Sequence, residues 1–230
     1  DYPASQLLAK YDAVVLAGGS TAPRDLPIPG REAAGVESAM DFLRPSYKRV
    51  AGDEIPAGTE ILAEGRDVVV SGGGDTGSAC VGTSFRQCAK SVTQIVIMPK
   101  PPEGRTEDTP WPTHPGPRML STSTSQAEGA VRDWAVMSKE FLTDEAGALR
   151  AIKAVRADWS SGRPKEVEGS EFELPAQLVT LAMGFLHPEH AVLNDFGVDK
   201  DDRGNCASAG YDTSPEAVFV RSEEHTSELQ

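Results

Sequence analysis

The stretch Val68–Gly77, VVVSGGGDTG, runs from β-branched apolar residues through three consecutive glycines into the start of a helical pattern. Residues 67–71 are expected to form a buried strand, 76–89 a helix and 91–98 (SVTQIVIM) a second strand. Parallel neighbours need a crossover of this kind. The order therefore predicts a βαβ unit and an α/β, Rossmann-like fold.

The glycines match the pattern GxGxxG at Gly72, Gly74 and Gly77. The first permits a tight turn, the second lets the backbone approach a pyrophosphate, and the third lets the helix pack closely on the strand. Free N–H groups at the helix start would hold the anion, with Asp75 or Thr76 as a helix cap. The motif predicts a dinucleotide site; the alternative is a glycine-rich turn that binds no ligand.

The end of the second strand bears on which dinucleotide is bound. NAD sites usually place an acid there, about 20 residues past the glycines, to hold the ribose 2′-hydroxyl. Here the strand ends in Met98, Pro99 and Lys100, and Arg105 follows. The two bases favour a 2′-phosphate and hence NADP, although they would also fit a loop of solvated charges beside NAD.

The N-terminal third contains three further segments. Residues 13–16 are expected to form a buried strand that ends in a turn at Gly18 and Gly19. Residues 32–44 have apolar side chains at helical spacing and are followed by Pro45, which predicts a helix with one buried face. A connector with a domain boundary is expected near 46–66.

Three segments follow the βαβ unit. Residues 99–116 are proline-rich and predict a long surface loop. Residues 135–159 indicate two strands joined by TDEAG, with a helix as the alternative for the second half. Residues 177–183, QLVTLAM, are typical of a strand buried on both faces, and Gly184 follows.

The composition excludes several classes of protein. The 230 residues are 39% hydrophobic and carry a formal charge of −13, which argues against a nucleic-acid surface. No apolar run approaches the roughly 20 residues of a membrane span, and the first residues do not resemble a signal peptide. A cytoplasmic protein without membrane contacts is expected.

No catalytic or metal-ligating residue is assigned. The three cysteines form no CxxC pair and are expected to be reduced thiols. His187 and His190 in LHPEH lack a third ligand of matching type and favour a solvated turn over a metal site. The tract STSTSQ has no nucleophile elbow, and the tryptophans favour burial over stacking on a cofactor.

Several motifs occur together and in order: YDAVVLAGGS, GGGDTG, CVGTS, KSVTQ, MPKPPE and AMGF. Between about Tyr11 and Val220 the chain resembles the small (β) subunits of bacterial glutamate synthases. That resemblance implies an NADPH domain at 66–185, inserted into an FAD domain of which 1–65 and 186–220 are partial pieces. It implies that Gly72, Gly73, Gly74, Asp75, Thr76 and Gly77 contact the NADPH pyrophosphate, and that Gly18, Gly19, Met183 and Gly184 lie where the chain crosses between the domains.

The resemblance also implies a function. In this family NADPH reduces FAD, and 4Fe-4S clusters pass the electrons to the large (α) subunit, where glutamate forms. The chain would be an internal fragment without the cluster ligands, inactive alone, and Arg221–Gln230 resembles a translated sequencing adapter. Two alternatives stay open: a related NAD(P)H–flavin oxidoreductase subunit with another partner, and a non-catalytic nucleotide-sensing module.

Overall fold

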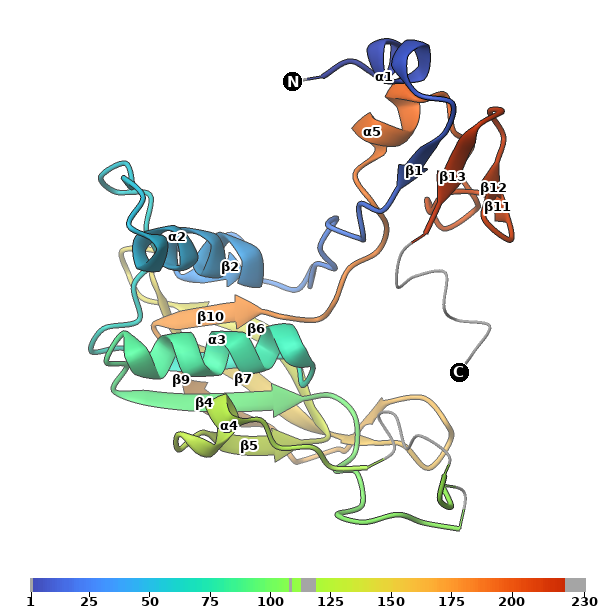
Figure 1. Cartoon of the computed structure of the whole chain (residues 1–230). Helices are drawn as coiled ribbons and strands as arrows, with labels where there is room; N and C mark the ends of the chain where they lie inside the picture. The colour runs from blue at the N-terminus through green and yellow to red at the C-terminus, as the bar shows by residue number, and fades with distance from the viewer. Residues whose placement is uncertain (1, 108, 113–118, 222–230) are drawn as a thin grey trace. The chain divides into compact units, whose positions relative to one another are not determined.

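The computed structural model describes residues 2–107, 109–112 and 119–221. Its contacts divide the chain into two units, Asp25–Gly184 and the pair Asp1–Arg24 with Phe185–Gln230. Figure 1 labels the elements of both. The tail 222–230, which the sequence analysis attributes to an adapter, lies outside the described residues, and so do residues 108 and 113–116 of the predicted proline-rich loop.

A five-stranded parallel sheet forms the centre of the larger unit. Its order is β2-β10-β3-β4-β5, so the chain's successive strands do not all lie side by side. The strands are β2 (Val36–Ser38), β10 (Leu178–Leu181), β3 (Asp67–Ser71), β4 (Ser91–Val96) and β5 (Val131–Trp134). The predicted βαβ unit is confirmed, since α3 (Asp75–Arg86) connects β3 to its parallel neighbour β4.

The two faces of this sheet are covered by different layers. Val68 and Val70 pack with α2 (Ala39–Ala51) and α3 in one core cluster, whereas Val69 packs with residues of the antiparallel strands in another. This division follows from the alternation of side chains along a strand. Each valine is at most 1% exposed, and burying such a side chain contributes about 1.5–3 kcal/mol.

The second sheet is antiparallel. β6 (Val136–Thr143) and β7 (Leu149–Asp158) form the hairpin that the sequence predicts over 135–159, and β8 (Lys165–Glu166) and β9 (Phe172–Pro175) both pair with β7. The larger unit is thus a three-layer α/β structure, as Figure 1 shows for its elements.

The helix predicted over 32–44 is wrong at both ends. Val36–Ser38 is strand β2, because Val36 pairs with Val179 of β10. Ser38 then caps α2 by accepting a hydrogen bond from the N–H of Asp41, and the helix runs through Pro45 to a left-handed Gly52. Proline removes one intrahelical hydrogen bond but keeps a helical φ, and the buried Phe42 and Leu43 anchor this turn.

The first unit boundary also differs from the expected one. It lies between Arg24 and Asp25 and not near residue 65, because β2 and α2 build the same sheet and core as β3. The second, after Gly184, adjoins the expected end at residue 185.

The smaller unit contains a four-stranded sheet of order β1-β13-β12-β11. Its strands are β1 (Val14–Leu16), β13 (Val218–Val220), β12 (Asp212–Thr213) and β11 (Ser208–Ala209). Two helices accompany it, α1 (Ala4–Lys10) and α5 (His190–Asp195), tied by a 2.9 Å hydrogen bond from the Ala4 N–H to Asp195. The predicted β1 is present but not buried, since Val15 is 61% exposed.

Candidate functional site

The glycine turn lies at the carboxyl edge of the parallel sheet, between β3 and α3. Gly72 has a φ of +132°, and a Cβ there would stand 2.0 Å from the carbonyl oxygen of Ala182, just past β10. Only glycine fits this backbone and this contact. The first glycine of the motif is therefore a requirement of the tight turn.

The next two glycines face different surroundings. A Cβ at Gly73 would lie 2.9 Å from a methyl carbon of Val96, at the end of β4. At Gly74 it would meet nothing within 4 Å, and the residue is exposed. Gly74 thus borders open space at the mouth of the turn, on the side from which a ligand can approach its backbone.

The start of α3 has no side-chain cap. Gly74 is the N-cap, so the expectation that Asp75 or Thr76 caps the helix is wrong: both have already entered its first turn. Helix geometry leaves the first N–H groups without intrahelical acceptors, and their partial positive charge attracts an anion. The exposed edge of the turn therefore presents donors suited to a phosphate.

The sequence analysis missed a buried polar chain behind this turn. Gln94 of β4 donates from Nε2 to the carbonyl oxygen of Gly72 at 2.8 Å and accepts a 2.8 Å bond from Nε2 of Gln126. Gln126 lies in α4 (Thr124–Ala127), whose N-cap is Ser123. The signals were a glutamine inside the apolar strand SVTQIVIM and the capping-box pattern Ser-x-x-Gln at Ser123–Gln126.

The two predicted base positions follow β4. Lys100 pairs with Glu103 at 2.9 Å, and its ammonium lies 5.5 Å from the ring centroid of Trp134. Arg105 donates to the carbonyl oxygen of Thr109 at 3.0 Å and lies over the ring of Trp111. The ammonium of Lys100 holds the pKa of the Glu103 carboxyl below its usual value.

A third base, Arg132 of β5, was not singled out by the sequence. Its guanidinium lies 5.0 Å from the Trp134 centroid and donates to the carbonyl of Ser121 at 3.0 Å. Trp134 thus has two cations, Lys100 and Arg132, near its ring at the carboxyl ends of β4 and β5. The two cations thus lie at the ends of β4 and β5, the strands that follow β3 in the order of the sheet.

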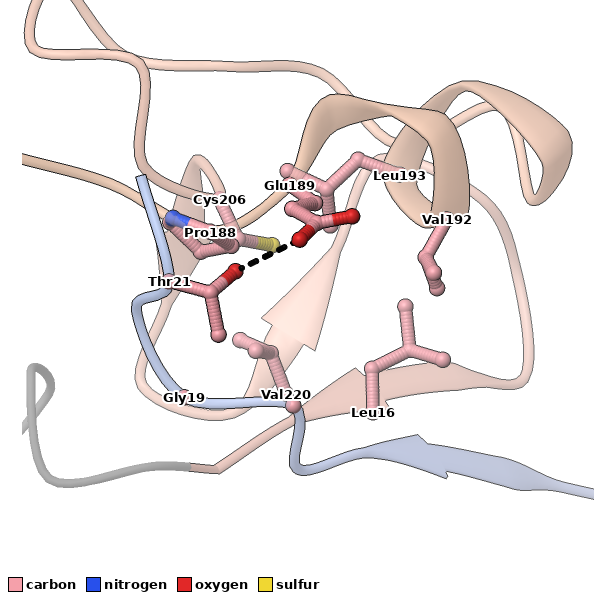
Figure 2. A pocket seen from close by; sticks show the side chains of 10 residues that line it. Leu16, Gly19, Thr21, Pro188, Glu189, Val192, Leu193, Cys206 and Val220 are labelled. Carbon is pink, nitrogen blue, oxygen red and sulfur yellow. Dashed lines mark hydrogen bonds between the residues drawn. The ribbon is translucent and has the colours of Figure 1, made fainter. Parts of the chain in front are cut away.

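The other predicted positions fall in or next to the smaller unit. Gly18 and Gly19 line a cavity of about 240 Å³ within it, together with Leu16, Thr21, Pro188, Glu189, Val192, Leu193, Cys206 and Val220. Figure 2 shows this cavity and the hydrogen bond from Thr21 to Glu189. Met183 and Gly184 are the last residues of the larger unit, where the chain passes to the smaller one.

The acidic, histidine and cysteine side chains bear on metal binding. Within the described ranges, no group of three or more His, Cys, Asp or Glu side chains could hold a metal ion. His187 and His190 stack at 4.3 Å, and each has a ring nitrogen within hydrogen-bonding distance of a backbone carbonyl. Among the same residues, no helix is long and apolar enough to cross a membrane.

The chain is similar in sequence to curated proteins and similar in fold to solved structures. No family model matches the chain. It is 47% identical over 225 residues to the glutamate synthase [NADPH] small chain of Mycobacterium tuberculosis, covering 96% of this chain and 46% of the relative. Over 233 residues it is 42% identical to glutamate synthase [NADH] of Schizosaccharomyces pombe, covering 96% of this chain and 11% of that protein.

Among solved structures, Mycobacterium tuberculosis FprA in complex with NADPH matches with a TM-score of 0.60 at 18% identity, covering 94% of this chain and 59% of FprA. That likeness confirms the predicted Rossmann-like α/β fold. The sequence resemblance seen in the motifs is confirmed as well. The chain is a homologue of the glutamate synthase small chain and spans about half of its length.

Proposed function

We propose that the larger unit binds NADPH at the carboxyl edge of its parallel sheet, with the pyrophosphate on the turn Gly72–Gly77. The observation that carries this proposal is Gly74, which is exposed, faces open space and is the N-cap of a 12-residue helix. A phosphate there would receive hydrogen bonds from the first N–H groups of α3. The rigid contacts of Gly72 and Gly77 hold the turn in shape for it.

We further propose that Lys100 and Arg105 select the 2′-phosphate, with Arg132 adding to the positive field. Lys100 and Arg132 both lie near the Trp134 ring, beside the strand end at which the adenosine ribose of such sites is held. The alternative is NADH, and it has a specific basis: the Schizosaccharomyces pombe relative is named for NADH. Glu103 beside Lys100 would suit a ribose hydroxyl.

In the longer protein to which the chain corresponds, we propose an electron-input role. The relatives are named as small chains of glutamate synthase, which supports a large-chain partner. Bound NADPH supplies a hydride, and a flavin is its expected acceptor. The part of this chain is to bind and orient the dinucleotide, so no described side chain is assigned as acid or base.

We infer that the cavity beside Gly18 and Gly19 is only part of a flavin site. The cavity at Gly18 and Gly19 holds about 240 Å³, below the roughly 300–1,000 Å³ of pockets for drug-sized ligands. We therefore propose that Gly18 and Gly19 belong to one piece of a flavin domain and that Met183 and Gly184 mark where the chain crosses toward it. The route through 4Fe-4S clusters is likewise a proposal for the longer protein.

The proposal is tested by titrating the 230-residue chain with NADPH and with NADH. Gly74→Val places a branched side chain in the open space of the turn, so NADPH binding should fall at least about tenfold while the fold persists. The control is Ala57→Val, because Ala57 is exposed in the connector before β3 and lacks the positive φ that would strain a branched side chain. Equal NADPH affinities of the Gly74 variant and the unaltered chain would refute the site.

A further inference from the structure

A chain of hydrogen bonds runs from the start of α4 to the glycine turn. The Ser123 N–H donates to Oε1 of Gln126 at 2.9 Å, and Nε2 of Gln126 donates to Oε1 of Gln94 at 2.8 Å. Nε2 of Gln94 then donates to the carbonyl oxygen of Gly72 at 2.8 Å. Three bonds thus connect a helix cap to the turn between β3 and α3.

The two ends of this chain fix its direction. The Ser123 N–H can only donate, so the oxygen of the Gln126 amide must face it and the nitrogen must face Gln94. The Gly72 carbonyl can only accept, so the nitrogen of the Gln94 amide must face it. Only one orientation of the two amides satisfies the Ser123 N–H, both glutamines and the Gly72 carbonyl. Rotating either amide by 180° places two donors or two acceptors opposite each other.

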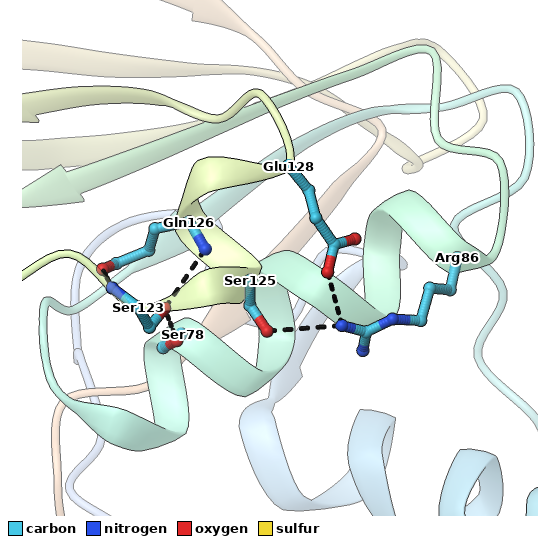
Figure 3. Close-up of polar contacts among 6 residues, drawn as sticks. All are labelled: Ser78, Arg86, Ser123, Ser125, Gln126 and Glu128. Carbon is cyan, nitrogen blue, oxygen red and sulfur yellow. Dashed lines mark hydrogen bonds and ion pairs between the residues drawn. The ribbon is translucent and has the colours of Figure 1, made fainter.

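Both glutamines are shielded from solvent. Gln94 is 0% exposed and Gln126 is 6% exposed. A buried amide that loses its partner has no water to replace it, which makes a broken chain costly. Figure 3 shows the start of α4, where the Ser123 hydroxyl also hydrogen-bonds that of Ser78 in α3. The segment before β5 is therefore tied to both sides of the glycine turn.

We infer that Gln126, acting through Gln94, positions the Gly72 carbonyl and thereby sets the glycine turn for dinucleotide binding. Neither glutamine contacts the dinucleotide in this scheme; both are positioning residues. The inference rests on the proposed NADPH site and identifies residues that hold the backbone of that site in place. It predicts that the affinity for the dinucleotide depends on the donor-to-acceptor order of these hydrogen bonds, and not only on the packing of α4.

Two variants separate direction from packing. Gln126→Met keeps the length of the side chain but neither accepts from Ser123 nor donates to Gln94. Gln126→Glu can still accept the Ser123 N–H, as in a capping box. Its ionised carboxylate offers only acceptors to Gln94, whereas its protonated form has an O–H that can donate.

Charged side chains on the elements beside α4 include Arg132, which donates to Ser121 and Thr122, and the pair Arg86 and Glu128. The hydrogen-bond partners of Gln126 among the described residues, Ser123 and Gln94, are neutral. Arg86 and Glu128 pair with each other at 2.5 Å, away from Gln126 in Figure 3. Burial without a cation partner raises the pKa of a carboxyl, so a carboxyl at position 126 is expected to titrate above its ordinary value of about 4.3.

The experiment measures the dissociation constant of NADP⁺ at about pH 8.5 and about pH 5.5, which brackets such a raised carboxyl pKa. Each variant is compared with the unaltered chain at the same pH, because the dinucleotide also titrates. Gln126→Met should bind about tenfold more weakly at both values. Gln126→Glu should bind about tenfold more weakly at the higher pH and within about twofold at the lower.

The control is Ser125→Ala, which alters the neighbouring residue of α4 and a 3.4 Å contact with Arg86 but leaves the amide chain intact. It should bind as the unaltered chain does. Affinity for Gln126→Met within twofold of the unaltered chain would overturn the inference, and so would a deficit in Gln126→Glu that is equal at both pH values. Full affinity of Gln126→Glu at both values, with Gln126→Met weak, supports it, because a carboxyl that stays protonated donates throughout.

Failure of the proposed function looks different. In that case the unaltered chain binds no NADP⁺ at either pH. The amide chain is then judged from the backbone N–H signals of Gly72–Gly77 in nuclear magnetic resonance spectra. Those signals should be displaced from the positions of the unaltered chain in Gln126→Met and keep them in Ser125→Ala. Unchanged Gly72–Gly77 signals in Gln126→Met would overturn the inference independently of any ligand.

Discussion

Gly77 packs so closely on Gly72 that a Cβ added to Gly77 would lie 2.4 Å from the carbonyl oxygen of Gly72. The obstacle is backbone and not the end of a flexible side chain. Gly77→Ala should therefore lower the free energy of unfolding by about 1–3 kcal/mol. Gly74→Ala should cost about 0.5 kcal/mol, because its Cβ meets nothing and only the N-cap preference is lost. Urea unfolding measures both, and equal losses would contradict this account of the third glycine.

Lys100 is expected to distinguish NADPH from NADH. Lys100→Ala should weaken NADPH binding about tenfold and NADH binding by less than about twofold, because only NADPH carries the 2′-phosphate. Arg105→Ala should act in the same direction. The matched control is Lys139→Ala, which removes the same charge from β6, where Lys139 pairs with Glu166. Titration with both dinucleotides decides the matter: parallel losses for the two would remove the argument for NADP.

Glu103 opposes Lys100 in the same loop. Its carboxylate accepts a 2.9 Å bond from the ammonium and would repel a phosphate placed there. Glu103→Gln should therefore tighten NADPH binding about twofold to fivefold and leave NADH unchanged or weaker, as expected for an exposed charge. Lowered NADPH affinity in this variant would indicate that Glu103 holds Lys100 in place.

Local patterns were sufficient to predict the core of the larger unit. Val68–Ser71 and the glycines that follow predict a strand, a turn and the start of a helix within a few residues. The structure contains all three, as β3, the glycine turn and α3. The hairpin of β6 and β7 also has a local cause, since its two strands adjoin the turn TDEAG. Where pairing partners are close in sequence, residue pattern and structure agree.

Distant pairing explains the rest. Val36 looked helical because its spacing to Ala39 and Leu43 is helical, yet it forms a strand against Val179, far along the chain. The same holds for Gln126: the tract STSTSQ gives no local sign of its role, which depends on Gln94 in the distant strand β4. Arg132 gains significance only through Trp134 and Lys100.

Cys80 is expected to be inert in the folded chain. Burial raises the pKa of its thiol from 9.0 to about 12, whereas Cys88 is exposed. Because only the thiolate attacks, iodoacetamide at about pH 8 should label Cys88 at once and Cys80 only in denaturant. Mass spectrometry of peptides after timed labelling measures this. Rapid labelling of Cys80 without denaturant would show that α3 opens readily.

The same burial makes stability depend on alkaline pH. Between pH 9 and about 12 the unfolded chain releases the Cys80 proton while the folded chain keeps it, so the free energy of unfolding falls as pH rises. The slope from this group is at most about 1.4 kcal/mol per pH unit. Below pH 9 both states hold the proton, so this group does not make stability depend on pH.

Urea unfolding at about pH 8.5 and about pH 10.5 measures this effect. The free energy of unfolding should fall more between the two values for the unaltered chain than for Cys80→Ala, and Cys88→Ala is the control that should keep the larger fall. Identical declines in all three chains would mean that the Cys80 thiol ionises as easily inside the fold as outside it.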